Sequence, residues 1–84
     1  STRTGPVEAC NPHEAIRAAV ATMRAANGTH GEFDIREEFD PSLPPVLANR
    51  DALEQVLINL LSNARDAALA GGGQAVVTVQ TRFV

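Results

Sequence analysis

The hydrophobic residues between positions 50 and 70 recur at the spacing of an α-helix. Apolar side chains fall three or four positions apart, which places them in one stripe along a helix. The members of this stripe are Leu53, Val56, Leu57, Leu60, Leu61, Ala64, Ala67 and Ala68. Asn49 is suited to cap the helix, and Asp51 favours the positive end of its dipole. The pattern predicts a helix over 50–70 whose stripe packs on a core.

A second amphipathic helix is predicted to begin at Asn11–Pro12 and to end near Ala26. Asn11 suits the cap, Pro12 suits the first helical position, and Glu14 stands where a capping box places a carboxylate. The Asn27–Gly28 pair supplies the stop, because glycine adopts the left-handed conformation readily. The apolar stripe of this helix consists of Ile16, Ala19, Val20, Met23 and Ala26.

Strands are predicted at 33–39 and 75–84, with shorter ones at 7–10 and 46–47. The longer two alternate apolar and polar residues, as half-buried strands do. Apolar residues on both faces near Ala75 favour a central strand. The glycine run 71–73 ends the helix before it. Two helices covering one face of a mixed sheet make a two-layer α/β sandwich of the α+β class.

Polar residues gather on one flank of the helix predicted over 50–70. On a helical wheel they are Gln55, Asn59, Ser62, Asn63 and Asp66. Asn59 and Asn63 are one turn apart and point the same way. Asparagine is a poor helix former, so two of them need a reason. Their carboxamide oxygens could ligate a hard cation such as Mg²⁺, or the flank could simply be solvated or locally hydrogen-bonded.

The run 53–68, LEQVLINLLSNARDAA, resembles the N box of the ATP-binding domain of sensor histidine kinases. The pattern is Leu, any, Gln, Val, Leu, any, Asn, Leu, Leu, any, Asn, Ala, any, any, Ala. The preceding run 40–52, DPSLPPVLANRDA, is similar to the segment that leads into this helix, although Asn49 stands where the family usually has aspartate. The nitrogen-regulatory sensor kinases are one subfamily that the sequence resembles.

This resemblance implies the N-terminal half of a histidine-kinase-like ATPase fold over 7–84, with 1–6 as a lead-in. It also implies that Asn63 holds Mg²⁺ on the triphosphate of ATP and that Asn59 contacts the phosphates or a metal-bound water. Hydrolysing members of the wider superfamily carry glutamate at the position of Asn59. A carboxamide cannot act as a general base near neutral pH, so we assign no catalytic residue. The implied acceptors are a histidine on a dimerisation domain and then an aspartate on a response regulator.

The later motifs of the family, Asp-x-Gly-x-Gly among them, do not occur in this sequence. We therefore expect a fragment without kinase activity of its own, with weak or no nucleotide binding. Its uncovered apolar surface would favour self-association. Two other classes stay open: another ATPase of the superfamily, such as an anti-sigma-factor kinase, or a non-catalytic α/β interaction module with a structural asparagine pair.

Composition narrows the class of protein further. Seven basic and ten acidic residues give a net charge of −3, which argues against a nucleic-acid binder. Cys10 is the single cysteine and is expected to be a small buried hydrophobe. No apolar run reaches a membrane span and no signal peptide opens the chain. We expect a soluble, cytoplasmic segment without membrane contact, whose parent could be membrane-anchored.

Four other polar residues are assigned no role. His13 and His30 lack the setting of the family's phospho-acceptor, because the capping pattern accounts for Glu14 beside His13. Asp66 stands where many family members have a basic residue that meets phosphate, and Arg65 faces away from the asparagine flank. We interpret Arg65 and Asp66 as solvated helix surface.

Overall fold

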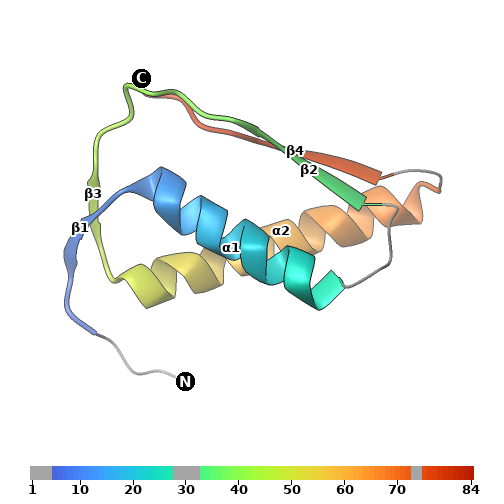
Figure 1. Ribbon diagram of the computed structural model, residues 1–84, viewed down its shortest axis with the longest axis horizontal. Helices are drawn as coiled ribbons and strands as arrows, with labels where there is room; N and C mark the ends of the chain where they lie inside the picture. The colour runs from blue at the N-terminus through green and yellow to red at the C-terminus, as the bar shows by residue number, and fades with distance from the viewer. Residues whose placement is uncertain (1–4, 28–32, 73–74) are drawn as a thin grey trace.

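The computed structural model of the chain describes residues 5–27, 33–72 and 75–84. Its elements follow the order β1 (Glu8–Cys10), α1 (Pro12–Asn27), β2 (Phe33–Glu38), β3 (Val46–Ala48), α2 (Arg50–Ala70) and β4 (Ala75–Gln80). Both helices lie on the same side of the β2–β4 pair, while β1 and β3 lie at one end of the helices (Figure 1). This arrangement confirms the α+β class and the two-layer packing.

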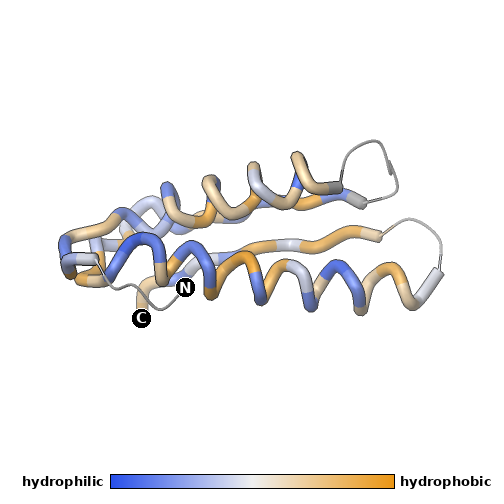
Figure 2. Tube along the Cα trace, turned by 90° about the horizontal axis from the view of Figure 1, so that it is seen from below, coloured by the Kyte–Doolittle hydropathy of each residue, from blue (hydrophilic) through white to orange (hydrophobic). Residues whose placement is uncertain are grey.

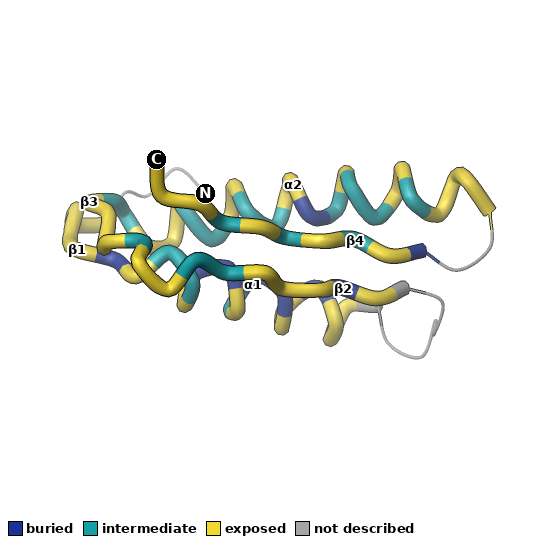
Figure 3. Tube along the Cα trace, turned by 90° about the horizontal axis from the view of Figure 1, so that it is seen from above, coloured by how far each residue is buried: buried dark blue, intermediate teal, exposed yellow. Residues whose placement is uncertain are grey.

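The strands form two separate two-stranded sheets in place of one continuous mixed sheet. β2 pairs in parallel with β4, from Phe33 opposite Ala75 to Glu38 opposite Gln80. β1 pairs antiparallel with β3, with Ala9 opposite Leu47. A parallel pair needs a crossover connection, which α2 supplies between β2 and β4. Viewed from above, α1 lies beneath β2 and α2 beneath β4 (Figure 3).

The prediction that β4 is a central strand is not met within the described residues. β2 is its only neighbour there. Val77 and Val79 pack against the core, whereas Val76 is 42% exposed on the other face. The apolar residue that suggested burial on both faces therefore lies on an open face. Figure 2 shows how hydrophobic β4 is along its length.

The core is centred on α1, although the sequence placed its strongest apolar pattern in α2. The buried cluster consists of Ile16, Ala19, Val20, Met23, Ile35 and Leu61. Leu61 is the only buried residue of α2. Val56 and Leu60 are 54% and 60% exposed and Ala67 is also exposed, so the prediction that the whole α2 stripe packs on the core is wrong for these three residues. Helix α2 contacts α1 and β4 through only part of its predicted apolar stripe.

The two helix starts are capped by asparagine, as predicted. The Oδ1 atom of Asn49 accepts from the N–H of Ala52 at 2.9 Å, and Oδ1 of Asn11 accepts from the N–H of His13 at 2.9 Å. Glu14 does not complete a capping box within the described part of the chain. Its carboxylate lies 3.7 Å from Nη1 of Arg50, which joins the first turns of the two helices.

The end of α2 also follows the prediction. The N–H groups of Gly71 and Gly72 donate to the carbonyls of Ala68 and Leu69. Gly72 adopts a φ of 79°, which is the left-handed conformation that ends many helices. The predicted stop at Gly28 lies outside the described residues. Neither described helix combines the length and hydropathy of a membrane span.

Replacing Asn49 with alanine is expected to lower the free energy of unfolding by about 1 kcal/mol. The substitution removes the side-chain acceptor for the N–H of Ala52 and leaves that donor to water. Urea denaturation followed by circular dichroism measures the change. Asn49→Asp keeps the acceptor and serves as the control. Equal midpoints for Asn49→Ala and the unsubstituted protein would contradict the capping role.

The carboxyl ends of β2 and β4 are tied to the start of α1 by a polar and aromatic cluster. Oγ1 of Thr81 lies 2.8 Å from Nε2 of His13 and accepts from the N–H of Asp40 at 2.9 Å. The His13 ring stacks on Phe39 at 4.5 Å, and the guanidinium of Arg17 lies 5.3 Å from the same ring. His13 thus has a structural environment; His30 lies outside the described residues.

Asp40 provides a pH-dependent contact in this cluster. Its carboxylate accepts from the hydroxyl and N–H of Ser42 and from the N–H of Phe83, and these bonds hold the pKa of Asp40 below its ordinary value of 3.8. A lowered folded-state pKa stabilises the protein above the unfolded-state pKa, and this stabilisation is lost as pH falls through the folded-state pKa.

We therefore expect Asp40→Asn to be less stable than the unsubstituted protein at pH 7. The difference should begin to shrink as pH falls below about 4, where the carboxylate of the unfolded protein takes up its proton, and it should disappear as pH falls through the lower folded-state pKa of Asp40. Thermal unfolding of both proteins between pH 2.5 and 7 measures the difference. A stability gap that does not change with pH would show that the charge of Asp40 contributes nothing.

Candidate functional site

The exposed face of α2 carries the asparagine pair. Asn59 and Asn63 are both exposed, and each stands two positions from the buried Leu61. Two positions correspond to a rotation of about 200° around a helix, so the pair lies opposite the core contact. The residues are one turn apart and share this outer face. The predicted side-by-side placement of Asn59 and Asn63 therefore agrees with the geometry of α2.

The polar flank that the sequence predicted is divided in the structure. Oγ of Ser62 donates to Sδ of Met23 at 3.3 Å, so Ser62 faces α1 and leaves the asparagine row. Nε of Arg65 lies 3.2 Å from Oδ1 of Asp66. The Asp66 side chain is 68% exposed, as a solvated residue should be, but that of Arg65 is only 25% exposed. The interpretation of Arg65 and Asp66 as solvated helix surface therefore describes Asp66, while Arg65 is partly covered.

Gln55 adds a third carboxamide to the row. Its Nε2 donates to Oδ1 of Asn59 at 3.2 Å across one turn of α2. Gln55 was placed on this flank by its spacing, but the spacing did not predict the hydrogen bond. Asn63 has no side-chain hydrogen bond to any described residue. The two asparagines therefore differ: the oxygen of Asn59 accepts from Gln55, whereas the oxygen of Asn63 accepts from none of the described residues.

The carboxamide oxygens on this face suit a cation that takes few protein ligands. Mg²⁺ prefers oxygen, retains several waters and completes its shell with phosphate. The carboxamide of Asn63 offers one such oxygen. Within the described residues no group of three or more histidine, cysteine, aspartate or glutamate side chains could hold a metal. The site therefore fits Mg²⁺ carried with a phosphate, but it does not fit a metal enclosed by protein ligands.

The basic residue at the start of α2 is engaged in ion pairs. Nε of Arg50 donates to Oε2 of Glu54 at 2.9 Å, and its guanidinium also lies near Glu14. The bond to Glu54 raises the pKa of Arg50. The described ion pair of Arg65 with Asp66 leaves that charge balanced as well. The described part of the chain thus neutralises the arginines of α2 internally.

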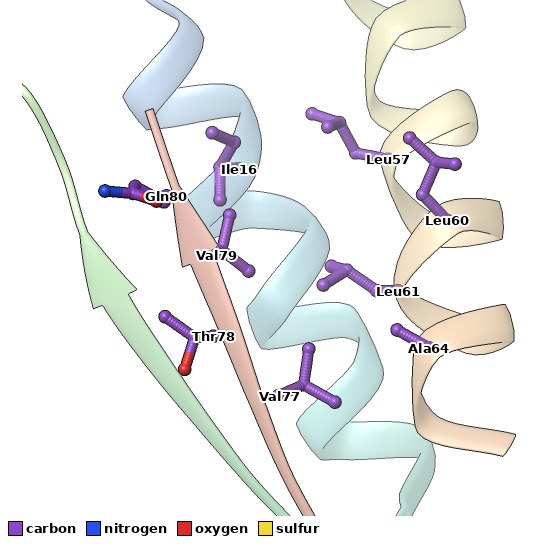
Figure 4. Close-up of a pocket in the computed structure, with 9 residues that line it drawn as sticks. All are labelled: Ile16, Leu57, Leu60, Leu61, Ala64, Val77, Thr78, Val79 and Gln80. Carbon is purple, nitrogen blue, oxygen red and sulfur yellow. The ribbon is translucent and has the colours of Figure 1, made fainter. Parts of the chain in front are cut away.

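An apolar groove runs between α2, β4 and the start of α1. Its volume is about 260 Å³. The residues that line it are Ile16, Leu57, Leu60, Leu61, Ala64, Val77, Thr78, Val79 and Gln80. Figure 4 shows Leu57 and Leu61 of α2 pointing toward Val77 and Val79 of β4. The groove adjoins the amide row, because Leu60 of its lining stands three positions before Asn63 and is therefore its neighbour on the surface of α2.

The groove is a feature that the sequence analysis missed. Leu60 was assigned to the core because its spacing matches the stripe, and spacing alone does not show which apolar residues find a partner. Combined with the amide row, the groove gives α2 an apolar flank next to carboxamides. Ligand sites commonly combine apolar walls with a few polar groups that orient the ligand.

Known proteins similar to this chain include several histidine kinases. The sensory histidine kinase/phosphatase NtrB of Rhizobium meliloti is 64% identical over 57 residues, which cover 68% of this chain and 14% of that protein. NtrB of Rhodobacter capsulatus is 38% identical over 73 residues, 87% of this chain and 19% of that protein. The cell-division control histidine kinase PdhS of Brucella anthropi is 37% identical over 71 residues, 84% of this chain and 6% of that protein.

No protein-family profile matches the chain. The chain spans less than a fifth of the length of each of these relatives. The similarity to several NtrB proteins nevertheless agrees with the resemblance of the run 53–68 to a histidine kinase sequence. By these matches the chain belongs to the sensor histidine kinases, as a segment of the nitrogen-regulatory type.

Proposed function

We propose that the parent of this chain binds Mg²⁺-ATP and transfers the γ-phosphoryl group to a histidine, for relay to a response regulator. In this proposal Asn63 holds the Mg²⁺ that neutralises the phosphate charge. Asn59 contacts the phosphates. The phosphoryl acceptors lie in other parts of the parent, namely a histidine-bearing dimerisation domain and an aspartate of the regulator. The segment described here would contribute the phosphate edge of the nucleotide site.

One observation carries the proposal: the two exposed carboxamides one turn apart on α2, in a segment that matches histidine kinases. Phosphoryl transfer depends mainly on positioning and on neutralising charge, so it requires a metal and an aligned acceptor more than a catalytic base. Neither asparagine can accept a proton near neutral pH. This chemistry favours holding ATP for transfer to an acceptor over activating water for hydrolysis.

The test is to incubate the full-length gene product with γ-labelled ATP and Mg²⁺. We expect the label on the protein in a bond that is labile in acid and stable in alkali, as a phosphorus–nitrogen bond is. A sample with EDTA controls for the metal. Label that remains in ATP, or that appears only as free phosphate, would overturn the proposal.

A structural role for the amide row is the second candidate. The observation that favours it is the Gln55–Asn59 hydrogen bond, since amide pairs of this spacing stabilise an exposed helix by a few tenths of a kcal/mol. In that case Asn59→Ala would leave nucleotide binding by the parent unchanged, whereas the kinase proposal expects nucleotide binding to weaken.

A further inference from the structure

The hydrogen bond between Gln55 and Asn59 fixes which way the Asn59 amide is turned, in addition to where the side chain lies. A carboxamide is planar, with its oxygen on one side and its NH₂ group on the other. In this structure the oxygen of Asn59 accepts from Nε2 of Gln55 at 3.2 Å. The NH₂ group of Asn59 is therefore on the other edge of the planar amide, directed away from Gln55. A different orientation would require this bond to break.

Asn63 is in a different situation on the same face. No described residue forms a hydrogen bond with its side chain, so its oxygen is available to a cation. An NH₂ group donates and cannot ligate a metal, whereas a carbonyl oxygen can. Anionic phosphate oxygens accept hydrogen bonds from such donors. The two asparagines thus present opposite chemistry, although the residue type is the same.

We propose that Gln55 is a positioning residue that holds the Asn59 carboxamide with its NH₂ group toward phosphate, leaving Asn63 as the metal-facing amide. This inference rests on the proposed function. It assigns separate tasks to the two asparagines: Asn59 recognises the anion of the nucleotide, and Asn63 recognises the cation. The neighbour that each asparagine has along α2 decides which task it performs.

Two substitutions at Gln55 test the orientation of the Asn59 amide while leaving that amide in place. Gln55→Leu removes the donor, so that the Asn59 amide can rotate. Gln55→Glu replaces the donor with a carboxylate, which only accepts. That carboxylate would bond the NH₂ group of Asn59 and turn its oxygen outward, toward the phosphate. The reversal should therefore weaken ATP binding more than the simple loss of the bond.

The added charge of the glutamate needs its own control. Ala52→Glu places a carboxylate seven positions before Asn59, on nearly the same line of α2 but two turns away. Ala52 is exposed, so the side chain can be accommodated. An effect of charge alone would appear in Ala52→Glu as well as in Gln55→Glu. An effect of amide orientation would appear in the Gln55 variants only.

The experiment measures the Kd of ATP for the full-length kinase and its variants, with Mg²⁺ and with EDTA. We expect Gln55→Glu to raise the Kd about tenfold, since a hydrogen bond to a charged group is worth at least that factor. Gln55→Leu should raise it by a smaller factor, and Ala52→Glu should not reproduce either effect. The losses should be equal with and without Mg²⁺. Asn63→Ala should weaken binding only when Mg²⁺ is present.

The alternative outcomes are distinct. Two results would overturn the positioning role while leaving the proposed function intact. One is an unchanged Kd in both Gln55 variants, and the other is a Kd that rises in these variants only when Mg²⁺ is present. If the unsubstituted kinase does not bind ATP in either condition, the proposed function fails together with this inference. The side-chain NH₂ signals of Asn59 in NMR spectra provide a second readout. In Gln55→Glu these protons should exchange with water more slowly than in Gln55→Leu, because they then donate to the carboxylate. Equal exchange in the two variants would overturn the turned amide.

Discussion

Leu61→Ala is expected to lower the free energy of unfolding by about 2 to 5 kcal/mol. Leu61 is 6% exposed and is the one described residue by which α2 enters the buried cluster. It packs with side chains of α1 and β2, among them Val20 and Ile35. Truncation removes those contacts and leaves a cavity among residues that are held by two other elements. The cavity therefore cannot close without moving α2.

Leu60→Ala is the matched control, since it deletes the same atoms one position away. Leu60 is 60% exposed, so its truncation should change the free energy of unfolding by less than about 1 kcal/mol. Equilibrium denaturation of both variants and of the unsubstituted protein measures the difference. Equal losses in the two variants would mean that Leu60 is covered in solution. They would contradict the partial packing of the α2 stripe.

The helices and their ends could be predicted because they depend on local chemistry. Asn11 and Asn49 cap because their side chains reach the first free N–H groups, and this requires only neighbouring residues. Gly72 ends α2 for an equally local reason. The division of strands between two sheets could not be predicted, because pairing depends on how distant segments meet. The turn that was expected at Gly28 lies outside the described residues.

The centre of the core could not be predicted for a related reason. The α2 stripe contains larger apolar residues than the α1 stripe, yet four of the six residues of the buried cluster come from α1. Burial depends on the neighbours of a side chain in space. Val56 and Leu60 match the helical period and still face a groove or solvent. A hydrophobic pattern thus indicates which residues could be buried, and packing decides which ones are.

The candidate site was predictable in its residues and less so in its geometry. Helical spacing placed Asn59 and Asn63 on one face, and both are exposed on α2. The spacing did not reveal that Ser62 turns toward Met23, or that Gln55 engages the oxygen of Asn59. These contacts depend on rotamers and on neighbouring elements. The roles of Asn59 and Asn63 in holding ATP and Mg²⁺ remain predictions, which the following substitution addresses directly.

Asn63→Ala in the full-length kinase is expected to reduce autophosphorylation by a factor on the order of 10² to 10³. A bound metal contributes several kcal/mol of charge stabilisation in the transition state, and each 1.36 kcal/mol corresponds to about tenfold in rate. The variant loses the asparagine oxygen on the outer face of α2 that no described residue engages. Its rate should recover partly at high Mg²⁺ concentration, since the metal then binds through the nucleotide alone.

The fold should not be responsible for this loss. Asn63 is exposed, and alanine is the better helix former, so the variant should be as stable as the unsubstituted protein or more stable by about 0.5 kcal/mol. Asp66→Ala removes a polar side chain from the same flank of α2 and should retain the rate within a factor of a few. A stable Asn63→Ala kinase with an unchanged rate would exclude the metal role. If Asn63 is a metal ligand, the variant should lose autophosphorylation rate without losing stability, and high Mg²⁺ should restore part of that rate. A structural amide would not give this combination.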